Sequence, residues 1–214
     1  MMDPHRRSPP TPEMGRLIGV DEVGTGAWAG PAVVCAVCMH PDQSPSGLKD
    51  SKAYSGSKRR SSRASVSAAL RATRGLYFCV QAVMPAEIDA HGLGTSVYQA
   101  MARAVAALRR EVGDVPCVVD GTRVPFGMTN ASAVVRADSQ YPSVMAASVI
   151  AKDYRDWLML RYADAPDLAP WKFERHVGYG TSEHEAAIAQ FGLSRLHRKS
   201  IRRFDLTTSS DRLG

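Results

Sequence analysis

The sequence has few cysteines and no long apolar segment. Four cysteines in 214 residues are too few for the disulfide framework of a small secreted domain. Cys35 and Cys38 form a CxxC pair, but no second pair follows at the spacing of a zinc site, so we expect buried free thiols in a reducing cytoplasm. No stretch reaches the roughly 20 apolar residues that span a bilayer, so we expect no membrane association.

Several sequence signals of other protein classes are also missing. Residues 1–14 contain four prolines but no apolar core, which argues against a secretory signal and predicts a disordered arm over residues 1–15. The chain has no GxxxxGK[ST] loop and no GxSxG turn, the motifs of P-loop nucleotide-binding proteins and of α/β-hydrolases. The glycines of residues 24–30 match a dinucleotide-binding fingerprint only in part, because the third glycine comes one residue late.

Positive charge is in excess. The net charge is +6 and the pI is about 9.3, which favours a polyanionic partner such as nucleic acid, although a well-solvated surface would have the same composition. The basic residues cluster at positions 58–60, 109–110 and 195–203.

The order of the expected elements indicates an α/β domain. Strands are expected over residues 17–20, 32–39, 76–83 and 117–119, with a weaker one over 133–135, and helices over residues 57–73, 95–111, 146–162 and 182–190. Prolines at 166 and 170 interrupt the pattern. We therefore expect a catalytic domain over residues 16–164, a C-terminal helical extension over 165–206 and a flexible tail over 207–214.

Four acids lie at the ends of these elements. Asp21 and Glu22 follow the first strand and precede a glycine-rich loop, Asp120 ends the strand before Gly121, and Asp138 precedes a helix. If those ends converge, four negative charges share one place, which requires bound cations. Oxygen ligands select Mg²⁺ or Mn²⁺, and two such ions would suit hydrolysis of a phosphodiester.

Each acid also has a simpler interpretation. Asp120 could cap a turn, Asp138 could favour a helix dipole, and Glu22 could be a surface residue. From spacing alone the shared metal site and these separate roles are about equally favoured. The histidines at 176, 184 and 197 could ligate a metal or shuttle protons, but ordinary hydrogen bonding is the more common role of such residues.

A series of motifs resembles the type 2 ribonucleases H, the ribonuclease HII family. Residues 19–26, followed by Ala-Gly-Pro at 29–31, are similar to the opening signature of that family. Further similar segments, in order, are residues 48–52, 87–89, 100–105, 119–121, 137–138, 147–156 and 173–181, then His184, Gly192 and His197-Arg198. The resemblance covers residues 17–204, and several ordered motifs are far more specific than any single one.

The resemblance implies a ribonuclease H-like fold, with a five-stranded mixed sheet flanked by helices and a C-terminal helical extension. It implies a metal-dependent endonuclease that cleaves RNA in RNA–DNA hybrids and single ribonucleotides in duplex DNA, leaving 5′-phosphate and 3′-hydroxyl ends. Asp21, Glu22, Asp120 and Asp138 would then be both the catalytic and the metal-binding residues. A monomer in the cytoplasm that serves DNA replication and repair is expected.

The resemblance also implies a set of substrate-binding residues. The backbone of Gly24, Thr25 and Gly26 would sense the ribose 2′-hydroxyl, and Tyr179 would pack on the sugar next to the cleaved bond. The family usually has Arg at the position of Thr25, so weaker binding or an altered preference for single ribonucleotides is expected. Lys52 and Lys152 could contact phosphates, or could equally be solvated or packing residues.

Two alternatives remain at this point. One is another two-metal nuclease of the same fold, which would cut branched DNA without any ribonucleotide. The other is a nucleic-acid-binding relative without activity, against which the four acids argue, because uncompensated carboxylates repel a polyanion.

Overall fold

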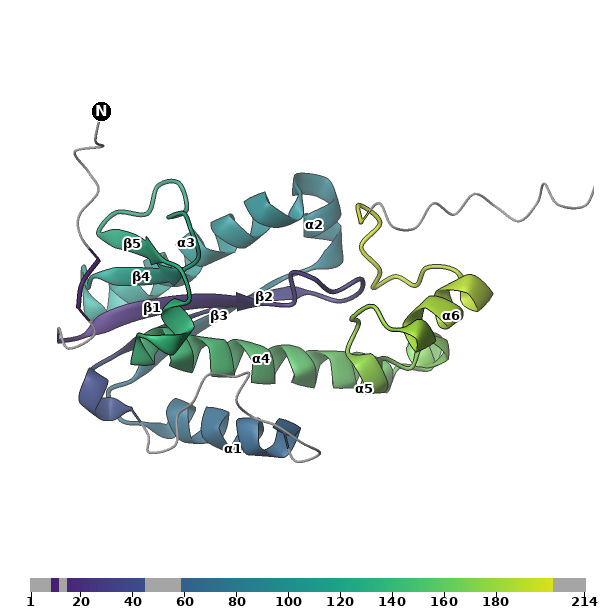
Figure 1. Ribbon diagram of the computed structural model, residues 1–214, viewed down its shortest axis with the longest axis horizontal. Coiled ribbons are helices and arrows are strands. Elements are labelled where there is room, and N and C mark those ends of the chain that lie inside the picture. Colours follow the sequence, from purple (N-terminus) through teal and green to yellow (C-terminus); the bar gives the residue numbers. More distant parts are fainter. Residues whose placement is uncertain (1–8, 12–14, 45–58, 202–214) are drawn as a thin grey trace, which may run out of the picture.

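The computed structural model describes residues 9–11, 15–44 and 59–201 (Figure 1). Lys52, one of the predicted phosphate contacts, lies outside the described residues, as do residues 207–214 of the predicted tail. Within the predicted N-terminal arm, the Pro10 carbonyl accepts a 3.0 Å hydrogen bond from the Tyr141 hydroxyl.

One mixed sheet of five strands forms the centre of the molecule, which confirms the predicted fold. The strands lie in the order β3-β2-β1-β4-β5. The pairs of β1 with β2 and of β2 with β3 are antiparallel, whereas β4 runs parallel to β1 and β5 parallel to β4. The bounds are β1 Leu17–Val23, β2 Ala32–Met39, β3 Tyr77–Val83, β4 Cys117–Asp120 and β5 Ala131–Val134.

The apolar run of β2 explains why helices cover both faces of the sheet. All eight of its residues are buried, and successive side chains point to opposite faces. Val34 and Ala36 belong to a core shared with α3 (Leu93–Val112), whereas Val33 and Cys35 belong to a core shared with α4 (Pro142–Ala163). In Figure 1, α2 (Pro85–His91) and α3 lie above the sheet, and α4 lies below it with α1 (Arg59–Ala72) outside.

The helix bounds differ from the predicted ones at functionally important places. The helix expected from residue 146 begins at Pro142, because proline is favoured in the first turn, where its missing N–H costs nothing. A 3₁₀ turn, η3 (Ala137–Ser139), precedes it and contains Asp138. Helix α2 was not among the helices expected from the sequence. A further 3₁₀ turn, η1 (Pro41–Gln43), follows β2.

The C-terminal extension has an apolar cluster of its own. It contains η4 (Pro166–Trp171), α5 (Phe173–His176) and α6 (Ser182–Phe191). Their buried side chains pack with Met159 of α4 and Ala29 of the loop after β1. This cluster therefore places the extension against the loop that follows the first two predicted acids, while the division into domains stays a prediction.

Two general expectations can be compared with the structure. All four cysteines are free; Cys35, Cys38 and Cys117 are buried and Cys79 is half-buried, as predicted. Among the described helices, none is both long enough and apolar enough to span a bilayer.

Candidate active site

Asp21 and Asp120 lie on neighbouring parallel strands. Val20 of β1 pairs with Val119 of β4, so the two aspartates follow at the same level of the sheet. Side-chain alternation places Asp21 on the same face as Gly19, the face covered by α4. The Asp21 carboxylate accordingly has a hydrogen bond with the Ser148 side chain of α4. Both acids lie inside the strands as the structure defines them, because β1 extends three residues beyond the predicted strand and β4 one residue.

The close approach of α4 depends on Gly19. A Cβ atom at this position would lie 2.2 Å from the Val144 backbone nitrogen and 2.3 Å from the Ser143 carbonyl carbon. Both are backbone atoms, so neither can rotate away. The absence of a side chain at Gly19 is therefore what lets the first turns of α4 reach the acids.

Three carboxylates influence one another electrostatically. The pKa of Asp21 is raised to about 7, first by burial and then by the negative charges of Glu22 and Asp120, and the Ser148 hydrogen bond offsets part of this increase. Burial also raises the pKa of Glu22, again with a contribution from Asp120. A bound cation would relieve this repulsion, so the chemistry of the donor set fits a hard divalent ion.

Asp138 belongs to the same region but enters it from a different element. It is buried in η3, with 3% of its surface exposed. The neighbouring Ala137 N–H donates a 2.9 Å hydrogen bond to Asp120 Oδ1, and the Glu22 N–H donates one of 2.8 Å to Asp21 Oδ1. In the part of the chain that the structure describes, no three His, Cys, Asp or Glu side chains are already arranged around one point. Binding an ion would thus require these carboxylates to turn.

The glycine-rich loop after β1 is shaped by two buried arginines. Gly24 has φ of +85°, and a Cβ atom there would lie 2.1 Å from Arg155 Nε. The Arg155 guanidinium donates to the carbonyls of Pro31, Val177 and Ala29, and the Arg198 guanidinium donates to those of Gly30, Thr25 and Gly24. Neither arginine had a role predicted from the sequence. The only signal was that each lies in a segment that resembles the family.

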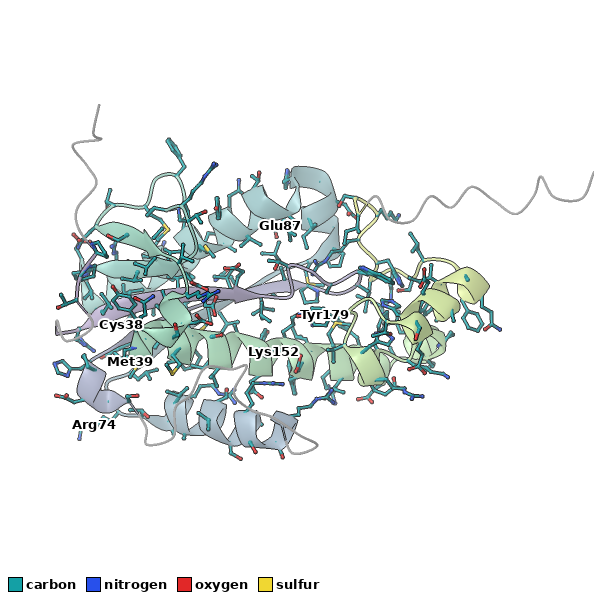
Figure 2. The ribbon with its side chains drawn as sticks, viewed as in Figure 1. Cys38, Met39, Arg74, Glu87, Lys152 and Tyr179 are labelled. Carbon is teal, nitrogen blue, oxygen red and sulfur yellow. The ribbon has the colours of Figure 1, made fainter. Side chains whose placement is uncertain are left out.

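Tyr179 lies against this loop. The Trp28 and Ala29 amides both donate to the Gly178 carbonyl, at 2.8 and 3.1 Å. Arg155 Cζ lies 4.8 Å and Lys152 Nζ 5.1 Å from the centre of the Tyr179 ring, so two cations lie close to this ring. Figure 2 labels Lys152 and Tyr179. The predicted tyrosine and glycine loop are thereby brought together, although 150 residues separate them.

Lys152 is held in place on its own helix as well. Its ammonium group donates a 2.8 Å hydrogen bond to Asp156, which also forms a buried ion pair with Arg63. The side chain of Lys152 is only 22% exposed. Of the two roles that the sequence left open for Lys152, these contacts favour packing over a phosphate contact.

Histidines of the extension form a hydrogen-bond chain that ends at Tyr179. The Ser194 amide lies 2.8 Å from His197 Nδ1 and can only donate, so the proton of that ring is on Nε2. His197 Nε2–H then donates to His184 Nε2 at 3.0 Å, and His184 Nδ1–H donates to the Tyr179 carbonyl at 3.0 Å. Both nitrogens of each ring are therefore used in hydrogen bonds, which supports the predicted ordinary hydrogen-bonding role rather than metal ligation.

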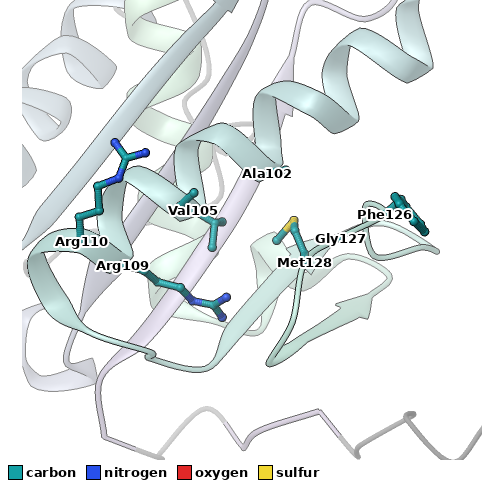
Figure 3. A pocket seen from close by; sticks show the side chains of 8 residues that line it. Ala102, Val105, Arg109, Arg110, Phe126, Gly127 and Met128 are labelled. Carbon is teal, nitrogen blue, oxygen red and sulfur yellow. The ribbon is translucent and has the colours of Figure 1, made fainter.

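A concavity of the protein surface lies apart from the four acids. It has a volume of about 600 Å³ and lies between α3 and the connection of β4 to β5. Its lining is formed by Ala102, Val105, Ala106, Arg109, Arg110, Phe126, Gly127 and Met128 (Figure 3). Since this lining contains two arginines and no carboxylate, it does not suit a cation.

Comparison with known proteins decides the family. The protein-family model described as Ribonuclease HII matches residues 18–208. The chain belongs to the ribonuclease HII family. It is therefore a metal-dependent endoribonuclease of the ribonuclease H type, as predicted.

Individual members of the ribonuclease HII family are similar to this chain over most of their length. The ribonuclease HII of Jannaschia sp. (strain CCS1) is 36% identical over 191 residues, which cover 88% of this chain and 91% of that protein. That of Burkholderia vietnamiensis is 38% identical over 186 residues, or 86% of this chain and 82% of that protein.

Solved structures share the ribonuclease HII fold at lower sequence identity. The ribonuclease H2 of Pyrococcus horikoshii OT3 superposes with a TM-score of 0.67 at 24% identity, covering 87% of this chain and 94% of that one. The ribonuclease HII chain from the PCNA complex of Archaeoglobus fulgidus has a TM-score of 0.67 at 23% identity, covering 86% and 92%. These likenesses show the fold.

The histidine chain gives this ribonuclease HII a predicted acid sensitivity. The pKa values of His184 and His197 are both lowered to about 4, mainly by burial and with a smaller contribution from the nearby His176 ring. In the unfolded chain a histidine titrates near 6.5, so between about pH 6.5 and 4 the unfolded state binds protons that the folded state excludes. The stabilisation of the folded state that comes from keeping these two histidines neutral is complete above that pH range and is lost as the pH falls through it. For the two rings together we expect a loss on the order of 3 kcal/mol, or roughly 6–12 °C in Tm, between about pH 7 and about pH 5.3.

Thermal melts monitored by circular dichroism would measure this acid sensitivity. His184→Gln removes one titrating ring, so its Tm should depend less on pH than that of the wild type. His91→Gln is the matched control, because His91 is exposed. An unchanged pH dependence in His184→Gln would contradict the assignment.

Proposed function

We propose that this enzyme cleaves the RNA strand of RNA–DNA hybrids and single ribonucleotides embedded in duplex DNA, with Mg²⁺ or Mn²⁺ bound by Asp21, Glu22, Asp120 and Asp138. One observation carries the proposal. Carboxylates from two neighbouring strands repel one another at the same place where a glycine-rich loop and Tyr179 meet. A metal site beside a loop with free backbone donors is what hydrolysis of a ribonucleotide phosphodiester requires.

The acids and the loop have different tasks in this proposal. When bound, divalent ions supply an activated water and stabilise the negative charge of the leaving oxygen. The strands and η3 would provide the backbone positions from which the four carboxylates turn toward the ions, so that the phosphodiester is held for in-line attack. The products would be a 5′-phosphate and a 3′-hydroxyl.

The glycine loop and Tyr179 select the substrate. The backbone of Gly24, Thr25 and Gly26 would bind the 2′-hydroxyl next to the cleaved bond, and the Tyr179 ring would pack on the neighbouring sugar. Lys152 and Arg155 contact that ring, which supports a role for both in holding it at the correct angle.

Substrate choice tests the proposal directly. Three labelled duplexes of one sequence would be compared in Mg²⁺ and in Mn²⁺: one with a single ribonucleotide, a long RNA–DNA hybrid, and an all-DNA duplex. We expect cleavage of the first two and none of the third. Cleavage of branched all-DNA substrates would contradict the proposal.

Tyr179→Ala should impair cleavage of a single embedded ribonucleotide more than it impairs binding to duplex DNA. Loss of the ring removes a positioning contact, and misplacement of the scissile phosphate by about 1 Å can lower the rate about 10²-fold. Single-turnover rates and fluorescence anisotropy would separate the two effects. Tyr179→Phe is the matched control, because it keeps the ring and its cation contacts. Equal activity of Tyr179→Ala and wild type would show that the side chain only fills space.

A further inference from the structure

Arg198 is a buried cation whose hydrogen bonds all go to backbone carbonyls. The residue is 0% exposed. Nη2 donates to the Gly24 carbonyl at 2.7 Å, Nη1 to the Thr25 carbonyl at 3.1 Å and Nε to the Gly30 carbonyl at 3.0 Å. Burial and the neighbouring Arg155 lower the pKa of Arg198 to about 10, so the guanidinium is still charged at neutral pH.

The position of these carbonyls fixes the direction of the amides that share their peptide units. In a trans peptide the C=O and the N–H point in opposite directions, and the described chain has no cis peptide bond. The Gly24 carbonyl shares its unit with the Thr25 N–H, and the Thr25 carbonyl shares its unit with the Gly26 N–H. Because both carbonyls point toward Arg198, both N–H groups point away from it.

The side toward which these two amides point is open. Among the described residues, neither the Thr25 N–H nor the Gly26 N–H donates to another group. Gly26 is exposed, and a Cβ atom built on it would meet nothing within 4 Å. Two adjacent donors without acceptors, facing open space, form a backbone site for a hydroxyl or a phosphate oxygen.

We propose that Arg198 is the positioning residue for ribose recognition: by holding the Gly24 and Thr25 carbonyls it turns the Thr25 and Gly26 amides toward the substrate. This inference rests on the proposed function and adds a residue to it. A cation at the carbonyl end of a peptide unit also polarises its N–H, which strengthens the hydrogen bond that the N–H donates. The side chain at position 25 takes no part, so threonine can stand where the family usually has arginine.

A matched pair of arginine substitutions tests this role. Arg198→Lys keeps the charge, but a single ammonium group cannot hold carbonyls in the forked arrangement of a guanidinium. Arg195→Lys is the control, since Arg195 lies three residues away, is exposed and pairs with Asp167. For each protein, binding would be measured by anisotropy to a duplex with one ribonucleotide and to the matched all-DNA duplex, with Tm as a check on folding.

The ratio of the two affinities is the decisive quantity. We expect Arg198→Lys to lower the preference for the ribonucleotide about 10-fold or more, with all-DNA binding nearly unchanged, and Arg195→Lys to keep the preference. A folded Arg198→Lys protein with the wild-type preference would overturn the role of Arg198. A purely structural residue would lower Tm and both affinities together.

Hydrogen exchange on the wild-type enzyme provides a test that needs no variant. The Thr25 and Gly26 amides should exchange rapidly in the free protein, and should be slowed by the ribonucleotide duplex but not by the all-DNA duplex. Slow exchange in the free protein, or equal protection by the two duplexes, would overturn the inference. If the wild type neither prefers nor cleaves the ribonucleotide duplex, the proposed function itself fails. If it does both and only the Arg198 results disagree, the proposed function stands.

Discussion

Asp21→Asn is expected to lower the cleavage rate by roughly 10³-fold or more while leaving the fold intact. Asp21 is buried, is hydrogen-bonded to Ser148 and lies beside Glu22 and Asp120. The amide has nearly the same shape as the carboxylate but cannot supply the charge that holds a divalent ion. Removing one of three mutually repelling charges should also raise Tm in the absence of metal, because buried Asp21 no longer has to ionise.

Single-turnover cleavage of the ribonucleotide duplex and metal-free thermal melts would measure both effects. Asp164→Asn is the control, since Asp164 lies at the far end of α4 with a side chain that is 76% exposed. The same loss of rate is expected for Asp120→Asn and Asp138→Asn. Near-normal turnover of any one purified variant in Mg²⁺ would remove that residue from the metal site.

Gly19→Ala is expected to cause a large loss of stability from a single methyl group. The new Cβ would lie 2.2 Å from the Val144 nitrogen, so β1 and α4 would have to move apart. Overpacking of this kind costs about 3 kcal/mol, or roughly 6–12 °C in Tm. Because Asp21 is two residues further along β1 and bonds to Ser148 of α4, the same displacement should lower activity in the protein that remains folded.

Gly94→Ala is the matched control for this substitution. Gly94 lies in the first turn of α3, and a Cβ atom there would meet nothing within 4 Å. Alanine favours a helix over glycine by about 1 kcal/mol, so this variant should be as stable as the wild type or slightly more stable. Differential scanning calorimetry would compare the two. A Gly19→Ala protein with the Tm of wild type would show that the strand and the helix can adjust without cost.

Local sequence pattern was sufficient for the sheet but not for the ends of its strands. The uninterrupted apolar run of β2 gave that strand its correct bounds, because burial on both faces needs such a run. The first strand was predicted to stop at Val20, yet pairing with β2 continues to Val23. Backbone pairing does not depend on side-chain polarity, so acidic residues at the end of a strand can still pair with the neighbouring strand. The spacing of these acids in the sequence does not show that the strand continues through them.

The acids of the candidate site could be picked out from the sequence, whereas the residues that arrange the loop could not. A carboxylate after an apolar strand is visible in the sequence, as at Asp120. Arg155 and Arg198 bind backbone carbonyls, and any residue type has a carbonyl. No complementary acid therefore marks these arginines in the sequence, and only the folded chain shows which loops they join.

The distance in sequence between Arg198 and the loop that it holds sets an order of events during synthesis. The strands and helices that build both cores of the sheet are complete once residue 163 has been made. The Gly24 carbonyl, however, accepts a hydrogen bond from Arg198, which lies 174 residues later in the chain. A ribosome-bound chain can thus fold its central sheet and its acids before its glycine loop has the Arg198 contacts. In the proposed mechanism, the enzyme would therefore gain its hydrolytic centre first and its ability to tell ribose from deoxyribose last.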